Sequence, residues 1–144
     1  MNILIANDHG AVDLKNDIVA SLRALGHMVE NLGVDTSDSV DYPDIAKKAT
    51  SRFLTGGFDF GILCCGTGIG ISIAANKVRG IRCALVFDLF TAEMSKRHNN
   101  ANFLSFGGRN NYSVPIIEMI KTYIASDYEG GRHAKRVEKI DRIQ

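Results

Sequence analysis

Residues 60–70 read Phe-Gly-Ile-Leu-Cys-Cys-Gly-Thr-Gly-Ile-Gly, an apolar run followed by two cysteines and a glycine-rich turn. The apolar run predicts a buried strand, and the segment from Ile69 to Val78 predicts a helix that begins at the turn. Glycines let the backbone turn tightly with its N–H groups pointing outward, toward the place that the positive end of the helix dipole faces. We therefore expect this turn to bind an anion and to stabilise a thiolate on Cys65.

The residues of the turn leave two functions open. In the first, the Cys65 thiol acts as a base beside an oxyanion. In the second, the turn holds the phosphate of a nucleotide in a nonenzymatic binding module, and the cysteine is only packed. The second has weaker support, because the glycines alternate with other residues instead of following the GxGxxG order, and no Walker lysine-serine ending is present.

Length and composition limit the class of protein. A chain of 144 residues, 45% hydrophobic and 23% charged, is expected to form one domain over residues 1–144 with its own core. The formal net charge of +1 predicts neither a nucleic-acid nor a membrane partner. The first six residues have no basic stretch and are too few for a signal peptide, so we expect them to form a strand of a cytoplasmic protein.

The three cysteines indicate no metal or disulfide framework. Two of them are adjacent, and the chain has no CxxC motif or paired Cys/His spacing, so neither a zinc site nor a set of disulfides is expected. Cys64 and Cys83 are interpreted as packed core residues, because neighbouring side chains on a strand point to opposite faces.

Short apolar runs alternate along the chain with segments of helical periodicity. Strands are expected at 2–6, 28–32, 59–65, 81–87 and 103–106, and helices at 11–25, 44–55, 69–78, 89–98 and 113–126. Repeated βα units with near-continuously apolar strands predict an α/β fold: a three-layer α/β/α Rossmann-like sandwich with a five-stranded parallel sheet. A C-terminal helical tail is expected over residues 127–144.

Ligands of such folds bind beyond the carboxyl ends of the strands. The residues that follow the expected strands are Asp8-His9-Gly10, Cys65-Gly66-Thr67-Gly68, Asp88 and Gly107-Gly108-Arg109. We expect these groups to converge at one edge of the sheet. The Asp8-His9 pair can orient a hydroxyl or carry a proton, although a helix N-cap with a surface imidazole explains it equally well.

Further candidates lie on loops and in the tail. Tyr42 stands at the start of an expected helix, where simple burial is the alternative. His98 and Asn99 close the fourth helix, where the negative end of the dipole alone favours a histidine. Arg132 and Arg136 share a helix face and can grip a phosphate, whereas the alternative is an exposed basic helix.

Several motifs occur together in the order typical of one known family. They are Asp8-His9-Gly10, Asp41-Tyr42-Pro43, the segment 65–77 (CGTGIGISIAANK), Gly80-Ile81-Arg82, His98-Asn99 and Glu129-Gly130-Gly131-Arg132-His133. On these residues the chain resembles the type B ribose-5-phosphate isomerases, from the first strand to the C-terminal helix. The superfamily also includes galactose-6-phosphate isomerase subunits and allose-6-phosphate isomerases, so a six-carbon sugar phosphate remains the alternative substrate.

The resemblance implies an aldose-ketose isomerase of the pentose phosphate pathway, which interconverts D-ribose 5-phosphate and D-ribulose 5-phosphate through a cis-enediolate without metal or organic cofactor. It implies that Cys65 is the base that moves the proton between C2 and C1, that His98 opens the sugar ring, and that Thr67 assists proton movement. The N–H groups of Gly66, Thr67, Gly68, Ile69 and Gly70 would stabilise the enediolate. Similarity places His9, Arg109, Arg132 and Arg136 at the phosphate, and the catalytic candidate Asp8 with Tyr42 and Asn99 at the hydroxyls or ring oxygen.

The resemblance also implies a homodimer whose active sites are shared between subunits, with a tetramer as a further possibility. A stripe of Val137 and Ile140 on the tail fits docking at a dimer interface. An inactive partner subunit is a third alternative, and the retention of every polar group named above argues against it. The chain departs from the family pattern at Ala11, where many relatives have glycine, and at Asn100, where aspartate is frequent.

Overall fold

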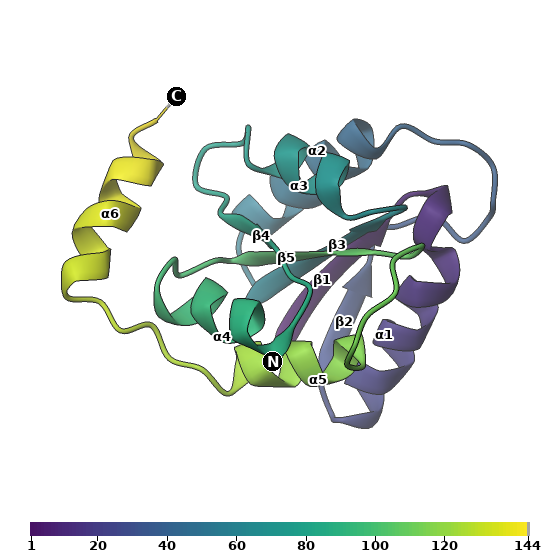
Figure 1. Cartoon of the computed structure of the whole chain (residues 1–144). Coiled ribbons are helices and arrows are strands. Elements are labelled where there is room, and N and C mark those ends of the chain that lie inside the picture. The colour runs from purple at the N-terminus through teal and green to yellow at the C-terminus, as the bar shows by residue number, and fades with distance from the viewer. Residues whose placement is uncertain (144) are drawn as a thin grey trace.

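Five parallel strands form one sheet in the computed structural model, which describes residues 1–143 (Figure 1). The strands are β1 (Asn2–Asn7), β2 (Met28–Asn31), β3 (Phe60–Cys65), β4 (Cys83–Leu85) and β5 (Phe103–Gly107). Their order across the sheet is β2-β1-β3-β5-β4, and every pair is parallel. The predicted five-stranded parallel sheet is confirmed. Gln144, the last residue of the predicted tail, lies outside the described residues.

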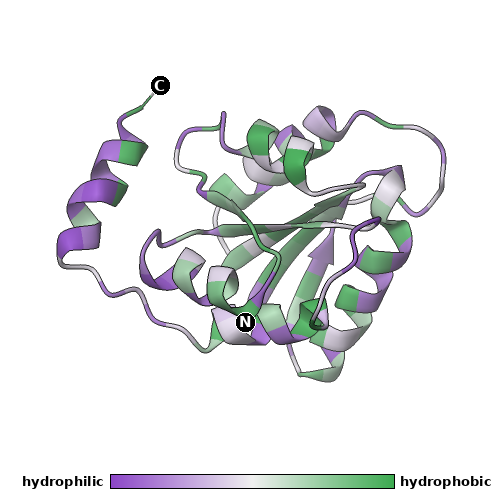
Figure 2. Ribbon diagram, viewed as in Figure 1, coloured by the Kyte–Doolittle hydropathy of each residue, from purple (hydrophilic) through white to green (hydrophobic). Residues whose placement is uncertain are grey.

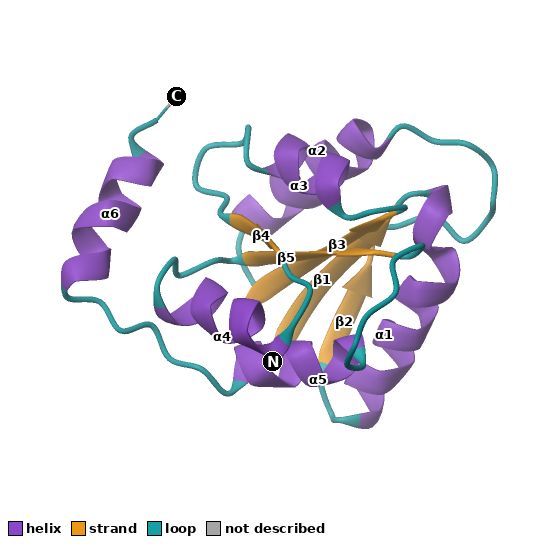
Figure 3. Cartoon of the chain, viewed as in Figure 1, coloured by secondary structure: helices purple, strands orange, loops and turns teal. Residues whose placement is uncertain are grey.

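Helices cover both faces of the sheet (Figure 3). One face carries α1 (Val12–Ala24), α4 (Leu89–Arg97) and α5 (Ile116–Ile124), and the other carries α2 (Tyr42–Leu54) and α3 (Ile69–Ala75). A short 3-10 helix, η1 (His9–Ala11), joins β1 to α1. The sixth helix, α6 (Arg132–Asp141), extends away from the sandwich and is largely hydrophilic (Figure 2). The three-layer architecture with a helical tail is therefore as predicted.

Alternating side chains of the strands build two separate cores. On β1, Ile3 and Ile5 pack toward α1 and α5, whereas Leu4 packs toward α2 and α3. The adjacent cysteines of β3 divide in the same way, because Cys64 belongs to the first core and Cys65 to the second. The two thiols therefore face opposite sides of the sheet.

The edge strand β4 is shorter than the predicted strand 81–87. The side-chain amide of Asn76 accepts a hydrogen bond from the N–H of Cys83 and donates one to its carbonyl, both at 2.8 Å. The backbone N–H of Arg82 donates to the side chain of Asn102 at 2.8 Å instead of to a neighbouring strand. These side chains satisfy the backbone where the ladder ends, so the edge needs no further strand pairing.

The direction of the sheet fixes where its loops lie. Because all strands are parallel, the segments after β1, β3 and β5 meet at the carboxyl edge. After β1 the chain continues to β2 at one end of the strand order, and after β3 it continues to β4 at the other end. A topological switch point therefore lies between the neighbouring strands β1 and β3. Within residues 1–143, no helix is both long and apolar enough to cross a lipid bilayer.

A close contact in the second core yields a stability prediction. A Cβ atom on Gly61 would lie 2.1 Å from Cε1 of the buried Phe103 ring. We expect Gly61→Ala to lower the free energy of unfolding by about 1–3 kcal/mol, because the added methyl overpacks the sheet. Urea denaturation measures this loss.

Phe103→Leu supplies the matched background for that test. The smaller side chain frees the space, so the loss caused by Gly61→Ala should be clearly smaller in the Phe103→Leu protein. An equal loss in both backgrounds would show that contact with the Phe103 ring is not the cause.

Candidate active site

The Cys65 thiol is held by the turn that follows it. Cys65 ends β3 and is 4% exposed, and its Sγ accepts a hydrogen bond from the backbone N–H of Gly68 at 3.1 Å. Gly68 has φ of +79°, and a Cβ there would lie 2.9 Å from the carbonyl carbon of Phe106. This position therefore demands glycine. The turn therefore directs one backbone N–H at the sulfur of Cys65.

The other two cysteines are packed, in agreement with the predictions made for them. Burial raises the pKa of Cys64 far above its ordinary value, and burial raises the pKa of Cys83 to about 12. Both thiols therefore stay protonated at neutral pH. All three cysteines are free thiols.

Asp8 and His9 follow β1 beside this thiol. The N–H of Asp8 donates to the carbonyl of Cys64 at 3.0 Å, which joins the ends of β1 and β3. Its carboxylate accepts from the N–H of Gly10 at 2.8 Å, so it serves as the N-cap of η1 that the sequence left open. The Nδ1 atom of His9 accepts from the N–H of Val40 at 3.2 Å. In the neutral ring, Nε2 therefore carries the proton and can donate to a ligand.

The loop after β5 is bonded to the turn that holds the thiol. The N–H of Arg109 donates to the carbonyl of Gly66 at 2.9 Å, and the N–H of Gly108 donates to the carbonyl of Cys65 at 2.8 Å. A Cβ on Gly66 would lie 3.5 Å from Nη1 of Arg109, so the guanidinium lies next to the turn. The cation thus stands where an anion at the turn would meet it.

Thr67 and Tyr42 border the turn on its exposed side. The Thr67 hydroxyl accepts from the N–H of Ile69 at 3.3 Å, and the Thr67 carbonyl accepts from the Asn110 side chain at 3.1 Å. The Tyr42 ring lies against the start of α3, since a Cβ on Gly70 would be 2.7 Å from its Cζ. Tyr42 is 40% exposed, so it is not a core residue as the burial alternative required.

Ten of the predicted site residues therefore meet at the carboxyl edge. They are Asp8, His9, Tyr42, Cys65, Gly66, Thr67, Gly68, Ile69, Gly70 and Arg109. The Asp88 carboxylate, by contrast, is used as a cap, because it accepts from the N–H of Thr91 at 2.7 Å and completes a capping box of α4. This bond holds the pKa of Asp88 below its ordinary value.

The other four candidates, His98, Asn99, Arg132 and Arg136, lie at the opposite edge of the same chain (Figure 1). β5 has five residues, so its two ends are about 13 Å apart. The last residue of β5, Gly107, pairs with Cys65, whereas the first residue of β5 comes directly after the loop that contains His98 and Asn99. One chain does not bring these four residues to the thiol.

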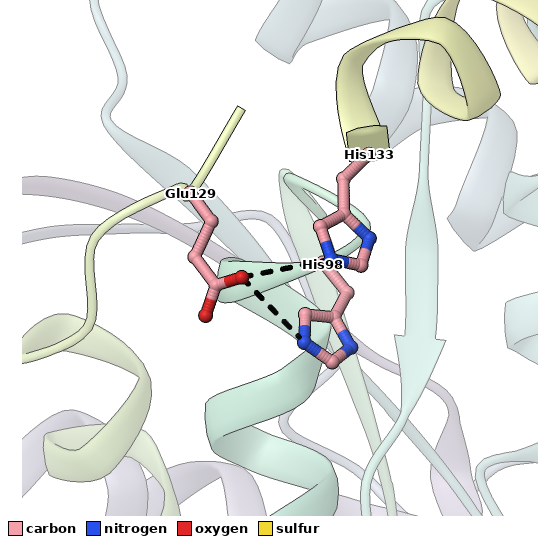
Figure 4. Close-up of side chains that lie close together, drawn as sticks. All are labelled: His98, Glu129 and His133. Carbon is pink, nitrogen blue, oxygen red and sulfur yellow. Dashed lines mark ion pairs between the residues drawn. The ribbon is translucent and has the colours of Figure 1, made fainter. Parts of the chain in front are cut away.

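His98 belongs to a cluster with Glu129 and His133 (Figure 4). The two imidazole rings stack with centroids 4.1 Å apart and planes within 8°. Oε2 of Glu129 lies 3.9 Å from Nε2 of His98 and 3.5 Å from Nε2 of His133. The Arg97 guanidinium holds the pKa of Glu129 below its ordinary value, and burial lowers the pKa of His133.

These three side chains do not fit a metal ion, although their ligand atoms all lie within 4.8 Å of one another. Parallel stacked rings direct their Nε2 lone pairs along parallel planes, so one ion cannot lie in both planes. The Glu129 carboxylate is also already paired with Arg97, since Nη2 of Arg97 lies 2.6 Å from Oε1 of Glu129. Glu129 and His133 had no predicted role. The signal in the sequence was their place in the motif Glu129-Gly130-Gly131-Arg132-His133, beside the predicted phosphate ligand Arg132.

Helix α6 is tied to its own chain at this edge. The Arg82 guanidinium pairs with Asp141 at 2.9 Å and donates to the carbonyl of Asn100 at 2.9 and 3.0 Å. Asn100 has φ of +45°, a conformation that asparagine tolerates after a helix end. In the stripe expected to dock, Val137 is buried within the chain, whereas Ile140 is 42% exposed.

Proteins of similar sequence and structure are known. A family model described as Ribose/Galactose Isomerase matches residues 3–140. Ribose-5-phosphate isomerase B of Escherichia coli K12 is 42% identical over 141 residues, which cover 95% of this chain and 92% of the relative. The Bacillus subtilis protein YwlF is 43% identical over 141 residues, covering 97% and 95%, and is named provisionally as a sugar phosphate isomerase without a specified sugar. A crystal structure of a ribose 5-phosphate isomerase from Thermotoga maritima has a TM-score of 0.95 and 44% identity, covering 99% of this chain and 98% of that chain.

The thiol environments yield a labelling prediction. At neutral pH, iodoacetamide should modify Cys65 before Cys64 and Cys83, because the Cys65 sulfur accepts the Gly68 N–H, whereas burial raises the pKa of the other two thiols. Gly68→Ala should slow the labelling of Cys65 by about tenfold, because a Cβ at this positive φ lies too close to Phe106, forces the turn to move and takes the N–H of residue 68 away from the sulfur. Peptide mass spectrometry of timed samples measures both rates.

Denaturation curves of the Gly68→Ala protein serve as the control for folding. Earlier modification of Cys83, which is 8% exposed, would contradict the assignment of the stabilised thiolate to Cys65.

Proposed function

The chain belongs to the ribose/galactose isomerase family, and from this membership and the site geometry we propose that it interconverts D-ribose 5-phosphate and D-ribulose 5-phosphate. The observation that carries the proposal is the Cys65 thiol, which the Gly68 N–H holds at the carboxyl end of a central strand. Membership in an isomerase family leaves the nonenzymatic nucleotide-binding module without support. The relatives from Escherichia coli and Thermotoga maritima are named for the ribose 5-phosphate reaction.

The proposed reaction begins with ring opening. The hydroxyl on C1 gives its proton to a water molecule, the bond between C1 and the ring oxygen breaks, and protonated His98 gives its proton to that oxygen, which leaves an open-chain aldehyde. The proton taken up by water restores the protonated His98. Asp8 and Tyr42 are the carboxyl-edge groups proposed to contact the sugar hydroxyls. Asn99, beside His98, is proposed to contact the ring oxygen.

Proton transfer between carbons follows. The Cys65 thiolate removes the C2 proton, and the electron pair moves to O1, which gives a cis-enediolate. Thr67 carries a proton from O2 to O1, and the Cys65 thiol returns its proton to C1 to form the ketose. Backbone N–H groups between Gly66 and Gly70 stabilise the charge on the enediolate oxygens, which the ground state lacks. The same thiol thus acts as base and then as acid.

The phosphate anchors the far end of the substrate. His9 offers its Nε2 proton and Arg109 its guanidinium from the carboxyl edge. Arg132 and Arg136 are exposed on α6 at the other edge. Since no single chain gathers these groups, we propose a homodimer in which each active site takes Cys65 from one subunit and His98 with the tail arginines from the other.

Exposed apolar side chains support this assembly. Phe87 and Phe90, next to the edge strand β4, are 56% and 67% exposed, and Ile69 and Ile73 on α3 are 51% and 56% exposed. Exposed large apolar side chains of this kind mark surfaces that take part in protein contacts. A dimer covers them, and two dimers can form a tetramer. The three free thiols fit the reducing cytoplasm, which we propose as the site of action.

Substrate preference separates the two sugar classes. We expect kcat/KM to be at least about tenfold higher for ribose 5-phosphate than for allose 6-phosphate or galactose 6-phosphate, because misplacement of the reacting carbons by one position costs rate. Coupled assays on the purified chain measure the three values. The description of the matching family names galactose beside ribose, so a six-carbon sugar phosphate is the alternative substrate, and a higher value for either hexose phosphate would establish it.

Subunit mixing tests the shared site. Cys65→Ala and His98→Gln proteins should each lose at least about 100-fold in kcat, because each lacks one acid or base. Refolding them together in equal amounts should restore about one quarter of wild-type activity, since half of the dimers are mixed and one of their two sites is intact. Activity that stays at the level of the single variants would show that both groups act from the same chain.

A further inference from the structure

Two histidines distant in sequence stack face to face at the amino edge of the sheet (Figure 4). His98 follows α4 and its side chain is 35% exposed, whereas His133 lies in the first turn of α6 and is 5% exposed. With ring centroids 4.1 Å apart and planes within 8°, His98 cannot turn its ring without driving an edge into His133. The buried ring therefore fixes the plane of the more exposed one.

A carboxylate borders both rings on one side. Oε2 of Glu129 faces Nε2 of each histidine, and Figure 4 shows the Nδ1 atoms on the side away from it. Arg97 binds the other oxygen, with Nε donating to Oε1 at 2.8 Å, and the backbone N–H of Glu129 donates to the carbonyl of Arg97 at 3.0 Å. Glu129 is thus anchored and stays charged, because Arg97 lowers its pKa.

The surroundings of His133 keep it neutral. The charged or titratable groups around it come from three segments: Arg97 and His98 at the end of α4, Glu129 in the preceding loop, and Arg132 and Arg136 on α6. Burial lowers the pKa of His133 most, the positive charges of His98, Arg132 and Arg136 lower it further, and only Glu129 raises it. Nε of Arg132 also donates to Nε2 of His133 at 3.4 Å, and only an unprotonated nitrogen accepts such a bond.

We propose that His133 is a positioning residue that acts through His98: its buried ring, stacked on that of His98, fixes the plane of the His98 ring beside Glu129. The inference rests on the proposed function, because His98 is there the group that opens the sugar ring. His133 itself does not touch the substrate. Its loss should therefore slow ring opening and spare the proton transfer at Cys65.

Two substitutions at His133 distinguish the effect of its flat ring from the effect of its ring nitrogens. His133→Phe keeps an aromatic face for His98 and cannot be protonated, whereas His133→Leu keeps an apolar side chain and loses the flat face. Lys135→Ala, at an exposed position of the same helix, is the matched control for changes in α6. Circular dichroism and sedimentation velocity show whether each variant keeps the fold and the assembly of the wild type.

Two activities report on the two chemical steps. Conversion of ribose 5-phosphate requires ring opening. Exchange of the C1 protons of ribulose 5-phosphate with deuterium oxide does not, because the phosphate on O5 prevents a furanose, and proton NMR follows it. For His133→Leu we expect kcat for ribose 5-phosphate to fall by about tenfold or more with KM within about twofold, while the exchange rate stays within about threefold. His133→Phe and Lys135→Ala should keep both rates within about threefold of wild type.

Several outcomes would overturn the inference. An equal fall of both rates in His133→Leu would indicate general damage to the site, and a loss in His133→Phe as large as that in His133→Leu would show that stacking is not what matters. NMR titration with ¹³C-labelled histidine tests the charge directly. A His133 signal that titrates at the ordinary value of 6.5 would contradict the uncharged state, even in a chain that converts no sugar phosphate. Failure of the proposed function is separate, since it would appear as wild-type protein inactive on ribose 5-phosphate.

Discussion

The parallel direction of the five strands is the constraint on which the rest of the molecule depends. It sends every strand end to one edge and every helix end to the other. Residues that follow strands, such as Cys65 and Arg109, therefore gather at the carboxyl edge, whereas His98, which follows a helix, lies at the amino edge. The isomerisation proposed for this chain uses groups from both edges. In that proposal a single chain of this topology holds only half of a site.

Local environment distinguishes three thiols that look alike in the sequence. Cys64 and Cys65 are neighbours on β3, but the alternation of the strand places them in different cores. Cys64 meets only packed side chains on its side, and burial raises its pKa. Cys65 stands at the last position of the strand, where the turn begins and Gly68 can donate an N–H. A shift of β3 by one residue would turn each thiol to the opposite face of the sheet and remove the difference between Cys64 and Cys65.

The sequence predicted the features that depend on near neighbours. The apolar runs and helical periodicity identified the sheet and its layers, and the order of glycines identified the turn at Cys65. Contacts between distant segments could not be predicted in this way. The shortening of β4 depends on the side chains of Asn76 and Asn102, and the stack of His98 on His133 joins two segments that meet because the start of α6 lies against the end of α4. The pattern of residues within one segment does not show which distant residues that segment will contact.

Separation of the two half-sites couples assembly to chemistry in the proposed dimer. A two-fold axis that brings the carboxyl edge of one subunit to the amino edge of its partner creates the reciprocal contact at the same time, so both active sites form together. The anchors of α6 are then part of the catalytic arrangement. Arg82, through Asp141, and Arg97, through Glu129, fix the tail to its own chain. Because these ion pairs lie within one chain, the proposed dimer does not need contacts with the partner to hold the amino-edge groups in place, and its binding energy is not spent on ordering the tail.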